Sequence, residues 1–103
     1  MPTYVSLMKL TDMGMLAIRE APQRLADGFK AFESRGGKVI GFYAAMGEYD
    51  YVIIGESPTD DLAFSFVLAL GAGGMIRTHT MRVFSLDTLV EQIEQLPAPR
   101  LET

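Results

Sequence analysis

The chain has 103 residues, of which 49% are apolar and 10% aromatic, and it contains seven methionines and no cysteine. This length is typical of one compact domain, and the high apolar content excludes a disordered chain. Without cysteine there is no disulfide, no thiolate metal site and no cysteine nucleophile. The apolar residues are more numerous than one small core needs, so the sequence raises the question of where the remainder lies.

Acidic residues outnumber basic ones by thirteen to nine, which gives a net charge of −4. The basic residues are scattered, whereas binding to a phosphate backbone needs clustered Lys and Arg, so we expect no nucleic-acid partner. The first residues lack the charged and apolar regions of a signal peptide. The longest uncharged run, 62–76, is too short to cross a bilayer. We therefore expect a soluble, cytoplasmic protein without membrane contact.

The first third of the chain predicts a strand followed by helices. Residues 3–10 are rich in β-forming side chains and predict a strand. Apolar residues then recur at helical spacing, but Pro22 is tolerated only in the first turn of a helix. The pattern predicts a short helix over 12–20 and a longer one over 22–35, which Gly36-Gly37 ends.

A β-hairpin is predicted next. Residues 38–46 and 49–56 are two β-rich runs separated only by Gly47-Glu48. Glycine at the first central position is typical of a type II′ turn of two residues. This register places Ala45 opposite Asp50.

The rest of the chain adds a helix, a strand and a last helix. Thr59 is the predicted N-cap of the first of these helices, and Ser85 is the N-cap of the last one. Between them, residues 75–84 predict the fourth strand. With no linker inside the chain, we expect one domain over 1–96 and a flexible tail over 97–103.

The order β-α-β-β-α-β with an additional C-terminal helix predicts an α+β, ferredoxin-like fold. In this fold two helices cover one face of a four-stranded antiparallel sheet. Short connections and right-handed crossovers leave few competing arrangements.

Alternation along the strands divides the sheet residues between two faces. One apolar set is assigned to the helix-covered core: Val5, Leu7, Ile40, Phe42, Tyr51, Ile53, Met81 and Val83. The opposite face is assigned Tyr4, Ser6, Met8, Val39, Gly41, Tyr43, Asp50, Val52, Ile54, Ile76, Thr78, Thr80, Arg82 and Phe84. This second face is too apolar to remain in water. We expect it to bind a second copy of the chain, with its polar members enclosed in a shared pocket.

Several segments also carry a family resemblance: 4–9, Thr11-Asp12, 41–43, Met46-Gly47-Glu48-Tyr49-Asp50, 68–71 and 76–78. Together they resemble the GYD-domain family, over roughly residues 3–95. The resemblance implies a ferredoxin-like, dimeric α+β barrel, and it implies no particular reaction. The chain departs from the family pattern at Leu10, where an aromatic is common, and at His79, where threonine is common.

Asp50 is the candidate catalytic residue. It lies on the predicted partner face beside Val52 and Ile54, and a carboxylate in such an apolar setting can act as a general base. The alternative is structural, with Asp50 accepting hydrogen bonds from the Gly47-Glu48 turn or from a partner chain.

The candidate ligand-binding residues share the same predicted face: Tyr4, Ser6, Tyr43, Thr78, Thr80 and Arg82. Their hydroxyls and the planar guanidinium group could orient a ligand. The alternatives are interface packing for the tyrosines and an ion pair with Asp50 or Glu56 for Arg82. The only histidine, His79, is expected to be structural, and no ligand spacing indicates a metal or another cofactor.

The sequence therefore predicts a small homo-oligomer that binds a small apolar or aromatic molecule at a sheet–sheet interface. One alternative is a cofactor-independent isomerase or oxygenase-type enzyme that uses Asp50 as its base. The other is a non-catalytic module for ligand sensing or assembly.

Overall fold

The computed structural model describes residues 1–98 and shows four strands and their connecting helices. In chain order the elements are β1 (Thr3–Leu10), α1 (Asp12–Leu16), the 3₁₀ turn η1 (Ile18–Glu20), α2 (Ala21–Ser34), β2 (Lys38–Ala44), β3 (Tyr51–Glu56), α3 (Asp60–Ala72), β4 (Ile76–Val83) and α4 (Leu86–Glu94). Of the predicted tail, residues 99–103 lie outside the described residues.

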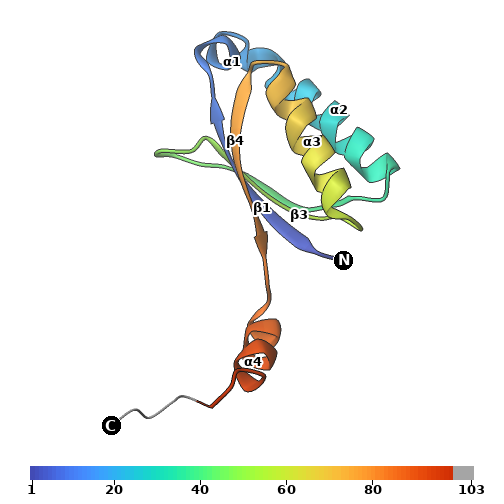
Figure 1. The fold of residues 1–103 in the computed structure, drawn as a ribbon. Helices are drawn as coiled ribbons and strands as arrows, with labels where there is room; N and C mark the ends of the chain where they lie inside the picture. Colours follow the sequence, from blue (N-terminus) through green and yellow to red (C-terminus); the bar gives the residue numbers. More distant parts are fainter. Residues whose placement is uncertain (99–103) are drawn as a thin grey trace.

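The four strands form one antiparallel sheet in the order β2-β3-β1-β4. Helices α2 and α3 lie on one face of this sheet, and the other face carries no helix (Figure 1). Helix α1 lies at one end of the strands, whereas α4 extends beyond the opposite end (Figure 1). This order and layering confirm the predicted ferredoxin-like α+β fold.

Helices α1, α3 and α4 begin at side-chain caps, and those of α3 and α4 are the predicted Thr59 and Ser85. The hydroxyl of Thr11 accepts a hydrogen bond from the N–H of Gly14 at 3.1 Å, and that of Thr59 accepts one from the N–H of Leu62 at 3.2 Å. These bonds satisfy N–H groups that the first turn of a helix leaves without a partner. Pro22 lies in the first turn of α2, as predicted. The helix predicted over 12–20 is instead divided at Ala17 into α1 and the 3₁₀ turn η1.

The hairpin between β2 and β3 has the predicted register. Ala44 pairs with Tyr51, and the N–H of Ala45 donates to the carbonyl of Asp50 at 2.8 Å. Gly47 has φ +121°, a conformation that side chains disfavour. The predicted two-residue turn at Gly47-Glu48 is not formed, because the regular ladder ends with the pair of Ala44 and Tyr51. The bond between Ala45 and Asp50 instead closes the loop 46–49.

The predicted faces of β1 and β4 are wrong. Directly paired residues of neighbouring strands share a face, and Met8 pairs with both Tyr51 and Thr78. Met8 is fully buried, at the centre of a core with Leu25, Tyr51, Ile53 and Ile76. The core therefore combines even-numbered residues of β1 and β4 with odd-numbered residues of β3.

The predicted assignment of side chains to the two sheet faces is also wrong in part of β2, because the strand contains an irregularity. The pairing shifts between Val39 and Gly41, so Val39 packs against the core, whereas Ile40 is exposed. Phe42 lies against the core as predicted. A bulge of this kind changes the side-chain alternation by one residue.

The uncovered side of the sheet, the open face, is still rich in apolar residues. Its members include Val5, Leu7, Tyr43, Val52, Ile54, His79, Met81 and Val83. The expectation of a partner surface on this side therefore stays a prediction, although five of these eight residues (Val5, Leu7, His79, Met81 and Val83) were not assigned to this side.

Candidate functional site

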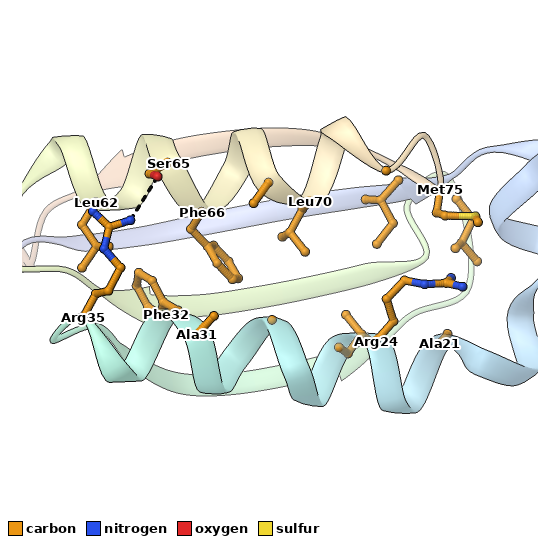
Figure 2. A pocket seen from close by; sticks show the side chains of 16 residues that line it. Ala21, Arg24, Ala31, Phe32, Arg35, Leu62, Ser65, Phe66, Leu70 and Met75 are labelled. Atoms are coloured by element: carbon orange, nitrogen blue, oxygen red, sulfur yellow. Dashed lines mark hydrogen bonds between the residues drawn. The ribbon is translucent and has the colours of Figure 1, made fainter.

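A groove separates α2 from α3 above the sheet (Figure 2). Its volume is about 360 Å³, and its floor includes Leu10 and Ile76 of the sheet. The space exists because small residues occupy facing positions of the two helices. These small residues are Ala21, Gly28 and Ala31 on α2, with Ser65, Ala69 and Gly73 on α3 or at its end.

The walls of the groove are apolar. Leu25 and Phe32 project from α2, and Phe66 and Leu70 project from α3. The rings of Phe32 and Phe66 contact each other with 4.6 Å between their centroids. This contact joins the two helices while leaving the remaining length of the groove open.

Two arginines mark the ends of the groove (Figure 2). Arg35 donates from Nη1 to the hydroxyl of Ser65 at 3.2 Å, which connects the C-terminal end of α2 to α3. Arg24 lies toward the opposite end, near Met75. Within the described chain, the residues that line the groove include no carboxylate. The groove therefore combines an apolar body with positive charge at each end.

A second, more open hollow of about 370 Å³ lies between α3 and the edge strand β4. Its polar residues are Tyr4, Asp60, Thr78, Thr80 and Arg82, and its apolar wall consists of Ala63, Phe64 and Val67. The hydroxyl of Tyr4 donates to Oδ1 of Asp60, and Nη1 of Arg82 lies 3.9 Å from Oδ2 of the same carboxylate. Burial, and then the hydrogen bond to Asp60, raise the pKa of Tyr4.

Five of the predicted ligand-binding residues thus come close together. Ser6 joins this group through a hydrogen bond of 2.7 Å between its hydroxyl and that of Thr80. They lie on the helix side of the sheet, however, and not on the open face where they were predicted. Tyr43, the sixth residue, is on the open face, because its partner Val52 lies there. These five residues therefore do not line a pocket between two open faces.

Asp50 lies apart from both cavities. Its Oδ2 accepts a hydrogen bond from the N–H of Leu10 at 2.8 Å. Arg82 pairs with Tyr4 at the other end of β1, and six residues of strand correspond to about 20 Å. Asp50 therefore does not act together with Arg82 within one chain.

His79 lies on the open face, where it pairs with Leu7. Its ring meets that of Tyr49 edge-on, with 5.9 Å between centroids. Strand β4 is an edge strand of the sheet, and His79 shares its face with Met81 and Val83. Among residues 1–98, no three Asp, Glu or His side chains are grouped so that they could hold a metal ion. No helix in the same part of the chain is both long and apolar enough to span a membrane.

The sequence analysis missed the groove between α2 and α3. A signal was present, because Ala21, Gly28 and Ala31 recur at helical spacing on the side of α2 that faces α3. Small residues at such positions also occur where helices pack closely. Only the distance between the two helices distinguishes a groove from a tight contact.

Comparisons with known proteins find relatives over most of the chain. The GYD domain model matches residues 4–93. A protein of Thermus thermophilus named "Glutamine synthetase and cystathionine beta-lyase binding protein" is 27% identical over 95 residues, which cover 91% of this chain and all of that protein. The crystal structure of TTHA0845, from the same organism, is 21% identical, covers 82% of this chain and 95% of its own, and gives a TM-score of 0.48. The chain belongs to the GYD-domain family.

Proposed function

We propose that the protein is a binding protein whose groove between α2 and α3 holds a small, mostly apolar molecule with an anionic group. The observation that carries the proposal is the groove itself, an apolar cavity of about 360 Å³ with an arginine toward each end. Pockets for small molecules are typically of this size, mainly apolar, with a few polar groups that fix the orientation of the ligand.

The charges favour an anionic group on the ligand. No carboxylate among the lining residues neutralises Arg35, whose nearest partner is the neutral hydroxyl of Ser65. Arg24 lies 4.0 Å from Glu20, and both side chains are largely exposed. Such an exposed pair is weak. A carboxylate or sulfonate at one end of an elongated apolar ligand would therefore meet an available guanidinium group.

Decanoate and the neutral decanol are suitable probes, with isothermal titration calorimetry as the measurement. We expect decanoate to bind the wild type, and Ala31→Phe to abolish binding because the new ring fills the groove. Ala26→Phe, on the side of α2 away from the groove, is the matched control and should bind like the wild type. Arg35→Gln should weaken decanoate at least tenfold and leave decanol unchanged. Equal binding to both phenylalanine variants would reject the groove as the site.

Catalysis by Asp50 stays an alternative. One oxygen of its carboxylate is occupied by the N–H of Leu10, which supports the structural role over the catalytic one. Turnover of a bound compound that Asp50→Asn removes, without loss of binding or folding, would support an enzyme instead.

Binding to other proteins is a second candidate function, and the relative named as a binding protein of glutamine synthetase and cystathionine β-lyase favours it. Sedimentation of the purified chain with a purified glutamine synthetase tests it directly. Co-sedimentation that Ala31→Phe leaves unchanged would show that any protein-binding surface is separate from the groove.

A further inference from the structure

The hollow between α3 and β4 is a second cavity, separate from the groove between α2 and α3. Its volume of about 370 Å³ is typical of pockets that hold small molecules. Within the described chain, the hollow and the groove have no lining residue in common. A ligand in the hollow would therefore not compete with a ligand in the groove.

Two elements that lie side by side form the hollow (Figure 1). One wall is a stripe of α3 at helical spacing, which consists of Asp60, Ala63, Phe64 and Val67. The other wall is the helix side of β4, with Thr78, Thr80 and Arg82. Asp60 is the first residue of α3, and Arg82 pairs with Tyr4 across the sheet. The charged groups therefore lie at one end of the hollow, and the apolar wall continues from there along α3.

A carboxylate and a guanidinium group face each other at this polar end. Oδ2 of Asp60 lies 3.9 Å from Nη1 of Arg82, which is too long for a hydrogen bond. The side chain of Asp60 is 69% exposed and that of Arg82 is 46% exposed, and an ion pair in such a setting contributes little to stability. Both groups therefore keep most of their hydrogen-bonding capacity for a ligand.

Neighbouring aromatic residues hold both charged groups in place. The hydroxyl of Tyr4 donates to Oδ1 of Asp60. Burial, and then this bond, raise the pKa of Tyr4, so its hydroxyl keeps its proton at neutral pH. On the other side, the guanidinium carbon of Arg82 lies 5.1 Å from the ring centroid of Phe84, close enough for a cation–π interaction. The opposite charges are thus positioned before a ligand arrives.

The charges of the hollow favour a zwitterion. Asp60 and Arg82 are its charged lining residues in the described chain, and together they have no net charge, so neither a cation nor an anion is attracted overall. An α-amino acid carries its ammonium and carboxylate groups on one carbon atom, and these two charges lie close together, as those of Asp60 and Arg82 do. The ammonium group can donate to Asp60 while the carboxylate accepts from the guanidinium group.

We propose that the hollow between α3 and β4 binds a free α-amino acid with an apolar side chain. The ammonium group meets Asp60 and the carboxylate meets Arg82. The amino acid side chain lies along the apolar wall of Ala63, Phe64 and Val67. The proposal does not depend on the groove or on its ligand.

Isothermal titration calorimetry with L-leucine and three analogues tests the chemistry of the ligand. We expect L-leucine to bind, and 4-methylpentanoate, which lacks the ammonium group, to bind at least tenfold more weakly. 3-Methylbutylamine, which lacks the carboxylate, and glycine, which lacks the side chain, should be weakened by a similar factor. Equal binding of L-leucine and 4-methylpentanoate would overturn the proposal, and so would the absence of binding by L-leucine, L-methionine and L-phenylalanine at millimolar concentration.

Variants of the two charged residues test the orientation of the ligand. Asp60→Asn should weaken L-leucine at least tenfold and strengthen 4-methylpentanoate, because it removes the carboxylate that attracts an ammonium group and repels an acid. Loss of folding would weaken both ligands. Arg82→Gln should weaken both, with an unchanged circular dichroism spectrum. The matched controls are Asp61→Asn, the next residue of α3, and Arg77→Gln on β4, since neither lines the hollow. If Asp61→Asn weakened L-leucine as much as Asp60→Asn does, the proposal would be overturned.

The same titrations in Ala31→Phe separate the hollow from the groove, which this substitution fills. We expect L-leucine to bind Ala31→Phe as it binds the wild type, whether or not decanoate binds in the groove. Loss of L-leucine binding in Ala31→Phe would place the amino acid in the groove and overturn the proposal.

Discussion

The carboxylate of Asp50 accepts a hydrogen bond from the backbone N–H of Leu10, with 2.8 Å between Oδ2 and the nitrogen. The N–H of Asp50 donates in turn to the carbonyl of Met8 at 2.8 Å. Asp50 therefore attaches the β2–β3 loop to the end of β1, at the point where the regular pairing of β1 with β3 stops at Met8 and Tyr51.

We expect Asp50→Ala to lower the free energy of unfolding by about 1–3 kcal/mol, because the half-buried N–H of Leu10 loses its acceptor. Urea unfolding measures this loss. Glu48→Ala, an exposed residue of the same loop, is the control and should change stability by less than about 0.5 kcal/mol. Similar losses for both variants would mean that the bond to Leu10 contributes little.

Two glycines in helices should respond to alanine in opposite ways. A Cβ on Gly14 would lie 2.1 Å from the carbonyl oxygen of Met75, whereas one on Gly28 would meet only Cδ2 of Leu70 at 3.7 Å. Gly14→Ala should therefore destabilise the protein by about 1–3 kcal/mol through displacement of the backbone. Gly28→Ala should stabilise it by about 0.5–1 kcal/mol through better helix propensity. Thermal unfolding of the two variants compares them, and equal melting temperatures would contradict the close approach of α1 to the backbone of Met75.

Two methionines represent the extremes of burial in this chain. Met8 is fully buried at the centre of the core, and Met46 in the hairpin loop is fully exposed. Met8→Ala should lower the free energy of unfolding by about 2–5 kcal/mol, because it leaves a cavity that the neighbouring strands cannot fill. Met46→Ala should leave the midpoint of urea unfolding unchanged. If Met8→Ala lowered the free energy of unfolding no more than Met46→Ala does, the assignment of Met8 to the core side of β1 would be wrong.

Stability should fall at alkaline pH. Burial raises the pKa of Tyr51, and the charge of Asp50 adds to this effect; the pKa of Tyr4 is raised as well. The folded state then keeps protons that the unfolded chain releases above about pH 10, so the free energy of unfolding decreases as the pH rises through that range.

Urea unfolding at several pH values between about 8 and 11 measures this slope. Tyr51→Phe keeps the ring contact with Phe42 at 5.2 Å between centroids but removes the titrating group. It should therefore flatten the slope. If the free energy of unfolding of Tyr51→Phe depended on pH as strongly as that of the wild type, the effect would come from other titrating groups.

Local patterns in the sequence were sufficient for the secondary structure. Thr11, Thr59 and Ser85 each accept a capping bond at the predicted helix start. The hairpin register, with Ala45 opposite Asp50, also followed from the spacing around Gly47, although the loop is longer than the predicted two-residue turn. These features depend on neighbours in the chain, which the sequence contains directly.

Local sequence patterns could not predict which face of each strand lies toward the helices. Both sides of β1 carry apolar residues, so alternation separates Val5 and Leu7 from Ser6 and Met8 without indicating which pair is buried. That choice is fixed by the pairing of Met8 with Tyr51, between residues far apart in sequence. A shift of one residue would exchange the two faces completely.

The candidate sites show the same division. The alternation of side chains along the strands correctly grouped Tyr4, Ser6, Thr78, Thr80 and Arg82. This worked because even-numbered residues of β1 pair with even-numbered residues of β4. Only the tertiary structure decides which side of the sheet these residues occupy. It also decides the width of the groove between α2 and α3.

By itself, the sequence determined the order of the elements, their caps, the hairpin register and an excess of apolar residues over one small core. The tertiary structure alone decided where that excess lies: on the open face, along the groove, and at the two ends of the strands in α1 and α4. Local periodicity sorts side chains into faces within one element. Only contacts between distant elements decide which of those faces is covered and which is left for a partner.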